Sequence, residues 1–307
     1  MPELPDVTIY VESLAERVVG RRIDSVRIIS PFVLRTFEPP VESVEGRRVL
    51  DVSRLGKRIV LGLEGDLFVV LHLMIAGRLR WTDGPDAKPA GGKIVLASFA
   101  FERGALAMTE ASTKKRASMH IVEGRSSLAR FSRGGIDVLT AGSDEFAAAL
   151  SRERHTLKRA LTDPRLFDGI GNAYSDEILH AAQLSPFKLT TSLSPAETAR
   201  LCTAARDTLL AWTDRLRDEF ADNAGGLRFP GPGQITAFRP DFAVHGRFGE
   251  PCPVCGTKVQ RVVYAEREFN YCPLCQTGGK ILADRSLSRL LRDHWPKTVE
   301  ELEALDG

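Results

Sequence analysis

Four of the five cysteines stand in two closely spaced pairs near the C-terminal end of the chain. Cys252 and Cys255 enclose two residues, sixteen residues follow, and Cys272 and Cys275 enclose two more. This spacing is typical of two thiolate pairs around one tetrahedral zinc ion, and in a reducing compartment it favours the metal over buried or oxidised cysteines. Because four thiolates leave no coordination position for water, the sequence predicts one structural Zn²⁺.

The first residues carry a second chemical possibility. In Met1-Pro2-Glu3-Leu4-Pro5, the small second residue favours removal of Met1, which exposes a secondary amine at the positive end of the first helix. Free α-amino groups have a pKa of about 8, and a helix N-terminus disfavours their protonated form. The exposed amine is then a nucleophile, although the two prolines are also compatible with a simple helix start.

Two further features are compatible with a polyanion. The glycines of Gly169-Ile170-Gly171-Asn172 let backbone N–H groups converge on a phosphate, although such a turn also serves as a tight helix connection. Residues 103–133 hold seven basic side chains, including Lys114 and Arg116, against two acidic ones, and residues 246–292 hold eight against four. Clustered basic residues indicate a nucleic-acid partner, or else an ordinary solvated face.

Several elements must position these residues. Apolar spacing predicts an amphipathic helix over residues 5–19, and short apolar runs over residues 21–133 predict the strands of a sandwich or barrel. Residues 144–161 and 175–183 are predicted as helices on either side of the glycine turn, and a third helix opens with a capping box at Ser194 and Glu197. A β-hairpin over residues 258–271 lies between the cysteine pairs, and Cys202 is expected in a helix core.

Composition sets the broad class. A length of 307 residues predicts about two domains, with a boundary near residues 135–143. The chain has 43% hydrophobic residues, which excludes a disordered protein, and a net charge of +2, which says little about partners. The absence of an 18-residue apolar run excludes a membrane span, and the absence of a basic, apolar leader predicts a cytosolic protein.

Taken in order, these motifs resemble the formamidopyrimidine-DNA glycosylase and endonuclease VIII family, with the Pro2-Glu3-Leu4-Pro5 start nearer the first branch. The resemblance also includes Lys57 in a strand and His72-Leu73 before Gly77, and it covers residues 2–276. It implies an α+β protein with an N-terminal β-sandwich lobe and flanking helices over residues 1–135. A helix-two-turn-helix domain over 143–235, a zinc finger over 245–280 and an extension over 281–307 would follow.

The resemblance implies a DNA glycosylase that is also an abasic-site lyase. Pro2 would attack C1′ of a damaged nucleotide and form a Schiff base, with Glu3 as general acid and base. Lys57, which the family places at the catalytic centre, would hold phosphates around the lesion together with Arg267 and with Asn172 beside Gly171. The Schiff base then permits successive elimination of the two phosphates, and the lesion is expected to be an oxidised base, with a preference for purines.

Such enzymes take the nucleotide out of the stack and fill the gap with a wedge side chain. Here the family's usual Met is replaced by Ile75, with Met74 one position earlier, and strand alternation would put the two on opposite faces. The Arg and Phe that usually complete the wedge have no clear match in residues 109–120, where Lys114 and Arg116 remain as DNA-binding candidates. Asp6 also replaces the usual Glu.

The expected partner is damaged double-stranded DNA, bound by a monomer in the bacterial cytoplasm or nucleoid, with no membrane and no nucleotide cofactor. The alternative function is a noncatalytic binder of damaged DNA that keeps the zinc lobe and the phosphate loop but has lost base removal, and the intact Pro2 and Glu3 argue against it. Separately, retention of Met1 would block the amine of Pro2 and abolish catalysis. A zinc hydrolase is excluded by the closed cysteine set. The acidic tail is expected to pack on the zinc lobe, and the competing possibility is that it weakens DNA binding.

Overall fold

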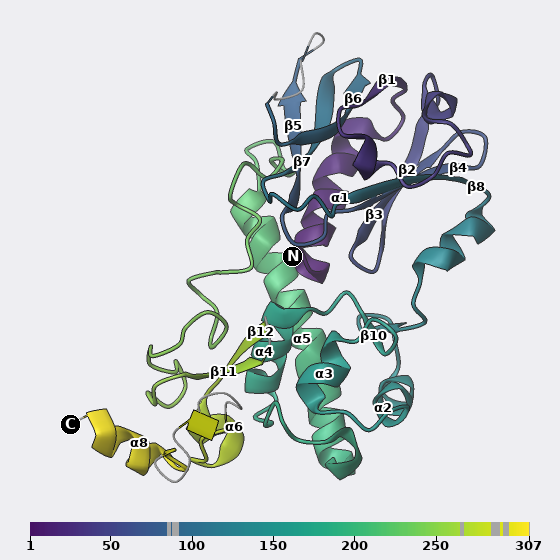
Figure 1. Cartoon of the computed structure of the whole chain (residues 1–307). Helices are drawn as coiled ribbons and strands as arrows, with labels where there is room; N and C mark the ends of the chain where they lie inside the picture. Colours follow the sequence, from purple (N-terminus) through teal and green to yellow (C-terminus); the bar gives the residue numbers. More distant parts are fainter. Residues whose placement is uncertain (85–86, 88–91, 265–266, 284–288, 291–294, 307) are drawn as a thin grey trace. The chain divides into compact units, whose positions relative to one another are not determined.

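The computed structural model describes residues 1–84, 87, 92–264, 267–283, 289–290 and 295–306. The chain divides into two compact units (Figure 1). The first holds residues 1–133 and 211–236, and the second holds residues 134–210 and 237–307. No helix in these described ranges combines the length and apolar composition that a bilayer-spanning segment requires.

The first unit is a sandwich of two antiparallel four-stranded sheets. One sheet has the order β1 (Ile23–Ile28), β6 (Val95–Phe101), β7 (Gly104–Glu110) and β5 (Gly77–Asp83). The other has the order β2 (Val49–Leu55), β3 (Arg58–Leu63), β4 (Leu67–His72) and β8 (Ser118–Glu123). Two short 3₁₀ helices, η1 (Pro31–Val33) and η2 (Val41–Val44), lie between β1 and β2, and a third, η3 (Arg125–Phe131), follows β8. The prediction of a sandwich is confirmed.

Alternation along the strands builds the core of this unit. In β4, Leu67, Val69 and Leu71 join the main core, whereas Phe68 and Val70 face a smaller cluster with Phe131 of η3. Helix α1 (Leu4–Val18) contributes its apolar face, including the fully buried Leu14, to the main core. The sheet β2-β3-β4-β8 is therefore covered on both faces, which fixes its strand ends as rigid supports.

The second unit is mainly helical. It contains α2 (Ser143–Ser151), α3 (Leu157–Thr162), α4 (Asn172–Ala181) and η4 (Thr190–Ser192), together with the short parallel pair β9 (Ile136–Asp137) and β10 (Phe167–Asp168). The hairpin of β11 (Gln260–Tyr264) and β12 (Arg267–Tyr271) precedes α6 (Pro273–Thr277), and α8 (Val299–Asp306) lies in the tail.

The structure differs from the expected helix over residues 144–161, which is broken. Helix α2 ends at Ser151, and α3 begins only after Thr156, whose hydroxyl accepts from the Arg159 N–H at 3.4 Å. Thr156 also forms a bridge with Leu189, and the Leu157 N–H donates to the Lys188 carbonyl at 2.8 Å. The backbone of this segment therefore pairs with a distant loop, which competes with continuation of the helix.

The first division, after residue 133, lies beside the predicted boundary near residues 135–143, and a second division falls within a helix. Helix α5 (Pro195–Phe220) crosses it, because Leu216 and Phe220 pack in the core of the first unit. Ile235 belongs to the same core. Residues 211–236 therefore lie with the N-terminal sandwich, whereas the predicted domain over 143–235 placed them with the helices.

The described parts of the tail pack on the hairpin. The Leu282 N–H donates to the Tyr271 hydroxyl at 2.7 Å, and Leu282 contacts the cluster that contains Phe269. Lys280 forms an isolated bridge with Thr298 just before α8. The expected packing of the tail is confirmed for these residues, while Leu287 and Leu291 of the expected tail helix lie outside the described residues.

Candidate functional site

Pro2 and Glu3 lie at the start of α1. Pro2 is buried, and Glu3 is the N-cap residue with only 4% of its surface exposed. The Glu3 N–H donates to Asp6 Oδ2 at 2.9 Å, and the Glu3 carboxylate accepts from the Asp6 N–H. This reciprocal capping box holds both carboxylates at the positive end of the helix. The Asp at position 6 therefore has a structural role beside Glu3.

The chain's terminal amine lies in a mixed electrostatic environment. Burial lowers the pKa of the Met1 α-amino group below its ordinary value, and the nearby Glu3 and Asp6 carboxylates oppose that shift. The cations of Arg78 and Lys57 lower the pKa further. An amine at this position therefore carries a larger neutral fraction near pH 7 than a solvated terminus does.

Lys57 is in a turn, and the prediction that it lies in a strand is wrong. Strands β2 and β3 are joined by the two residues Gly56 and Lys57, with Leu55 paired to Arg58 across the hairpin. Gly56 has φ 59°, as the first position of a type II′ turn requires. The tight turn places the half-buried Lys57 at the tip of a rigid hairpin, in electrostatic range of the terminal amine.

The two wedge candidates also lie in a turn, between β4 and β5. Strand alternation does not apply to them, because β4 ends at His72 and Met74 has φ 53°. Met74 is half-buried, whereas the side chain of Ile75 is 60% exposed. Ile75 is therefore the candidate that is available to enter a base stack.

Lys114 and Arg116 are exposed in the loop between β7 and β8. The loop is folded around Glu110, a residue with 2% exposure, whose Oε2 accepts from the N–H groups of Arg116 at 2.8 Å and Ala117 at 3.1 Å. This buried carboxylate satisfies the backbone of the loop while the two basic side chains stay in solvent.

The glycine turn leads directly into α4. Gly171 is the N-cap residue, and Asn172 is the first residue of the helix. Asn172 Nδ2 donates to the Glu268 carbonyl of β12 at 2.7 Å. The N-terminus of α4 is thereby held against β12, the strand that begins with Arg267, whose side chain lies outside the described part of the structure. A helix N-terminus of this kind favours an anion.

A buried polar network lies beneath this turn, and the sequence reasoning missed it. Lys158 Nζ donates to Asp176 Oδ1 at 2.5 Å, to the Asn172 carbonyl at 2.6 Å and to Ser175 Oγ at 2.9 Å. The other oxygen of Asp176 contacts His245 Nδ1 at 2.7 Å. The contributing residues come from α3, α4 and the segment before the zinc finger, so only the three-dimensional fold brings them together.

The four paired cysteines converge as predicted. Cys252 and Cys275 have their Sγ atoms 3.9 Å apart, and those of Cys255 and Cys272 are 3.4 Å apart. All four ligand atoms lie within 4.8 Å of one another. A tetrahedral ion with Zn–S bonds of about 2.3 Å requires sulfur separations of roughly 3.8 Å. The residues therefore fit one structural Zn²⁺, held by these four thiolates. Cys202 lies outside this cluster and is buried, as predicted.

Helix α4 also contacts this centre. His180 Nε2 lies 3.3 Å from Cys252 Sγ, and both residues are buried. Burial lowers the pKa of His180, so the neutral ring with a single N–H is favoured at this position. His245 is not among the four clustered ligand residues and contacts Asp176 instead.

Comparison with known proteins matches all three parts of the chain. The family model of the formamidopyrimidine-DNA glycosylase N-terminal domain matches residues 1–117, and that of its H2TH domain matches residues 138–214. A zinc finger found in FPG and IleRS matches residues 249–278. The tail from residue 279 onward lies outside these matches.

Whole-length relatives carry the same description. A formamidopyrimidine-DNA glycosylase of Symbiobacterium thermophilum is 34% identical over 286 residues, which cover 90% of this chain and 89% of that protein. The enzyme of Heliobacterium modesticaldum is 30% identical over 284 residues, covering 90% of this chain and all of that protein. An uncharacterised formamidopyrimidine-DNA glycosylase-like protein of Mycobacterium tuberculosis is 43% identical over 158 residues, 52% of this chain and 94% of that protein.

Solved structures show the same fold. The Fpg protein of Lactococcus lactis, in complex with DNA that contains an abasic site, matches with a TM-score of 0.75 and 23% identity over 90% of this chain and 99% of its own. MutM in complex with DNA that contains carbocyclic 8-oxo-G matches with a TM-score of 0.76 and 24% identity, over 90% of this chain and all of its own.

Proposed function

Because the chain belongs to the formamidopyrimidine-DNA glycosylase family, we propose that it excises an oxidised base from double-stranded DNA and then nicks the abasic site. The observation that carries the proposal is the buried Pro2-Glu3 start of α1, next to a terminal amine whose pKa the Lys57 cation helps to lower. Zn²⁺, when bound, supplies structural cross-linking of the finger and no chemistry at the DNA.

Removal of Met1 makes the Pro2 nitrogen a secondary amine. Its lone pair attacks C1′ of the damaged nucleotide, the C1′–N bond to the base breaks, and the base leaves with the bonding electrons and gains a proton. Opening of the sugar forms the C1′=N⁺ Schiff base, while Glu3 gives a proton to the ring oxygen. Burial lowers the pKa of the Met1 α-amino group, and similar surroundings would keep the lone pair of the Pro2 amine available.

Strand cleavage follows from the acidity of the Schiff base. A carboxylate, for which we propose Glu3, takes a proton from C2′, and the electron pair expels the 3′ phosphate. A second elimination expels the 5′ phosphate, and water releases the sugar remnant and restores the amine. Lys57 is suited to hold a lesion-strand phosphate, because its ammonium lies at the tip of a rigid hairpin.

Binding of the DNA backbone is assigned to both units. In the second unit, the N-terminus of α4 at Gly171 and Asn172, with Arg267 on the adjoining hairpin, would contact phosphates. In the first unit, the exposed Lys114 and Arg116 would contact the flanking duplex, and Ile75 or Met74 would fill the gap in the stack. The protein would act as a cytoplasmic monomer without a nucleotide cofactor, with a preference for oxidised purines.

The test is borohydride trapping on abasic DNA, preceded by intact mass to establish removal of Met1. We expect the wild-type protein to become covalently linked, and Pro2→Gly and Glu3→Gln to lose most of the adduct and of base excision. Glu12→Gln is the matched control, because Glu12 lies on the same helix and pairs with Arg217. Adduct formation on a lysine, with Pro2→Gly equally active, would overturn the mechanism. Binding without trapping by a Met1-free protein would favour the noncatalytic alternative.

A further inference from the structure

The turn that carries Ile75 is closely constrained by its own backbone. The Gly77 N–H donates to the Leu73 carbonyl at 2.8 Å, and Met74 has a positive φ of 53°. A Cβ atom at position 77 would lie 2.2 Å from the Leu73 carbonyl oxygen, so only glycine fits there. This backbone presents Ile75 to solvent on a short, stiff loop.

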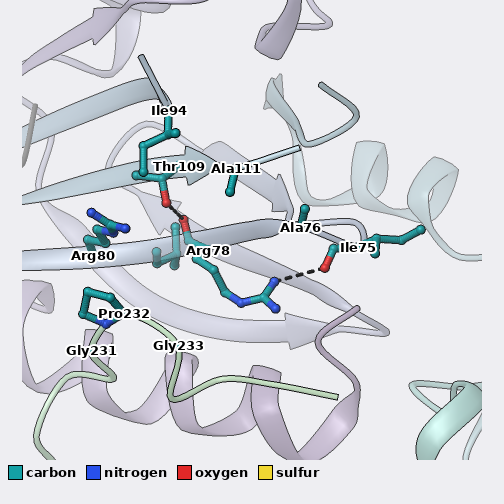
Figure 2. A pocket seen from close by; sticks show the side chains of 11 residues that line it. Ile75, Ala76, Arg78, Arg80, Ile94, Thr109, Ala111, Gly231, Pro232 and Gly233 are labelled. Carbon is teal, nitrogen blue, oxygen red and sulfur yellow. Dashed lines mark hydrogen bonds between the residues drawn. The ribbon is translucent and has the colours of Figure 1, made fainter. Parts of the chain in front are cut away.

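Arg78 adds a second constraint from outside the turn. Its Nη1 donates to the carbonyls of Ile75 at 3.1 Å and Gly77 at 2.7 Å, as Figure 2 shows for Ile75. Its Nε donates to the carbonyl of Ile235 at 2.8 Å. A guanidinium is planar, stays charged at all relevant pH values and donates in fixed directions, so one side chain fixes three carbonyls relative to one another.

Ile235 ends a Gly- and Pro-rich segment, residues 231–235, that belongs to the same compact unit as the turn. The segment is closed on itself, because the Gly231 N–H donates to Gln234 Oε1 at 2.6 Å and Ile235 is 2% exposed. Between it and the turn lies a cavity of about 330 Å³, lined among others by Ile75, Arg80 and Pro232 (Figure 2). Arg78 therefore links the turn that carries Ile75 to residues 231–235 by hydrogen bonds, although a cavity separates parts of the two loops.

We propose that Arg78 is a positioning residue that couples residues 231–235 to the turn bearing Ile75, so that wedge insertion and the position of that segment depend on each other. The proposal rests on the proposed function. Arg78 acts on the turn through the backbone carbonyls of Ile75, Gly77 and Ile235. Thr109 of β7 holds the backbone of Arg78, since the Thr109 hydroxyl donates to the Arg78 carbonyl at 3.2 Å.

The experiment uses the full-length protein and a duplex that contains a non-cleavable tetrahydrofuran abasic analogue, with 2-aminopurine as the neighbouring base. Wedge insertion unstacks 2-aminopurine and raises its fluorescence. We expect Arg78→Ala to lose most of this rise, and to lower kcat of base excision about tenfold with a smaller change in KM, as loss of charge-assisted hydrogen bonds predicts. Arg78→Lys should restore only part of the signal, because an ammonium cannot reproduce the fork. Arg27→Ala, an exposed β1 arginine, is the matched control.

A double-substitution cycle separates coupling from general damage. If Arg78 acts through Ile75, then Ile75→Ala with Arg78→Ala loses no more signal than Ile75→Ala alone. Additive losses, or a normal fluorescence rise in both Arg78 variants, would overturn the proposal. If Arg78→Ala does not fold, Arg78→Lys in the same cycle decides. A wild-type protein that raises the fluorescence but neither excises nor traps would refute the proposed function and leave the coupling standing. No fluorescence rise with the wild type overturns the coupling.

Discussion

Substitution of Lys158 by Met is expected to destabilise the helical unit strongly. Lys158 places all three ammonium protons on buried acceptors, with Asp176 Oδ1 at 2.5 Å as the ionic partner. The two side chains are 9% and 0% exposed. Removal of one member of a buried pair leaves an uncompensated charge, which costs about 3–5 kcal/mol. Because His245 and the Asn270 N–H still contact Asp176, we expect the lower end, about 3 kcal/mol of unfolding free energy.

Urea unfolding followed by circular dichroism, with zinc release as a probe local to this unit, measures the effect. The double variant Lys158→Met with Asp176→Asn should be more stable than Lys158→Met alone, since a neutral amide needs no counter-charge. Lys188→Met is the matched control, because its pair with Glu197 is only partly buried and surface pairs contribute less than about 1 kcal/mol. A cost below about 1 kcal/mol for Lys158→Met, or fully additive costs, would refute this reasoning.

Three further predictions concern acid stability, zinc and the tail. Burial and nearby cations lower the pKa of both His72 and His120 to about 4. Unfolded histidine titrates near pH 6.5, so their contribution to stability is complete above about pH 6.5 and is lost as the pH falls toward 4. His72→Gln with His120→Gln should flatten urea midpoints over that range, and an unchanged slope would contradict it. In His180→Phe, Cys252 loses a hydrogen-bond donor, so the variant should release zinc faster to a chelator. The thiolate charge-transfer bands of the Co²⁺-substituted variant should also shift. Identical release rates and spectra would exclude that contact. Deletion of residues 293–307 should leave DNA affinity and its salt dependence unchanged, whereas tighter binding would support competition by the acidic tail.

Local signals in the sequence were sufficient for elements whose partners are close along the chain. Ser194 and Glu197 form the predicted capping box, with the Ser194 N–H 2.9 Å from Glu197 Oε2 and the Glu197 N–H 3.2 Å from Ser194 Oγ. The cysteine spacing likewise predicted a cluster that the fold confirms. The capping box lies within one helical turn, and the two cysteine pairs are joined by the β11–β12 hairpin, so residue spacing along the chain determines both geometries.

The sequence-based predictions were wrong where a turn, or a residue distant along the chain, determines the local structure. The hairpin at Lys57 was readable from Gly56, because a two-residue loop with glycine first is a type II′ signal. The break before α3 was not readable, since it depends on pairing of Thr156 with Leu189. Similarly, the apolar face of α5 continues without interruption along the helix. The sequence therefore does not indicate that Leu216 packs in the core of the first unit, while the start of the helix belongs to the second unit.

Helix α4 explains why zinc and phosphate binding should be linked. Its first residue, Asn172, contacts the hairpin through Nδ2, its middle holds Lys158 and His245 through Asp176, and its last turn contacts Cys252 through His180. Ten residues thus connect the proposed phosphate-binding turn to the cysteine cluster. A rigid helix transmits a displacement at one end to the other, so loosening of the cysteine cluster should weaken DNA binding at the proposed phosphate-binding turn. The same logic predicts that Lys158→Met weakens DNA binding with zinc fully bound, because it releases the Asn172 carbonyl directly.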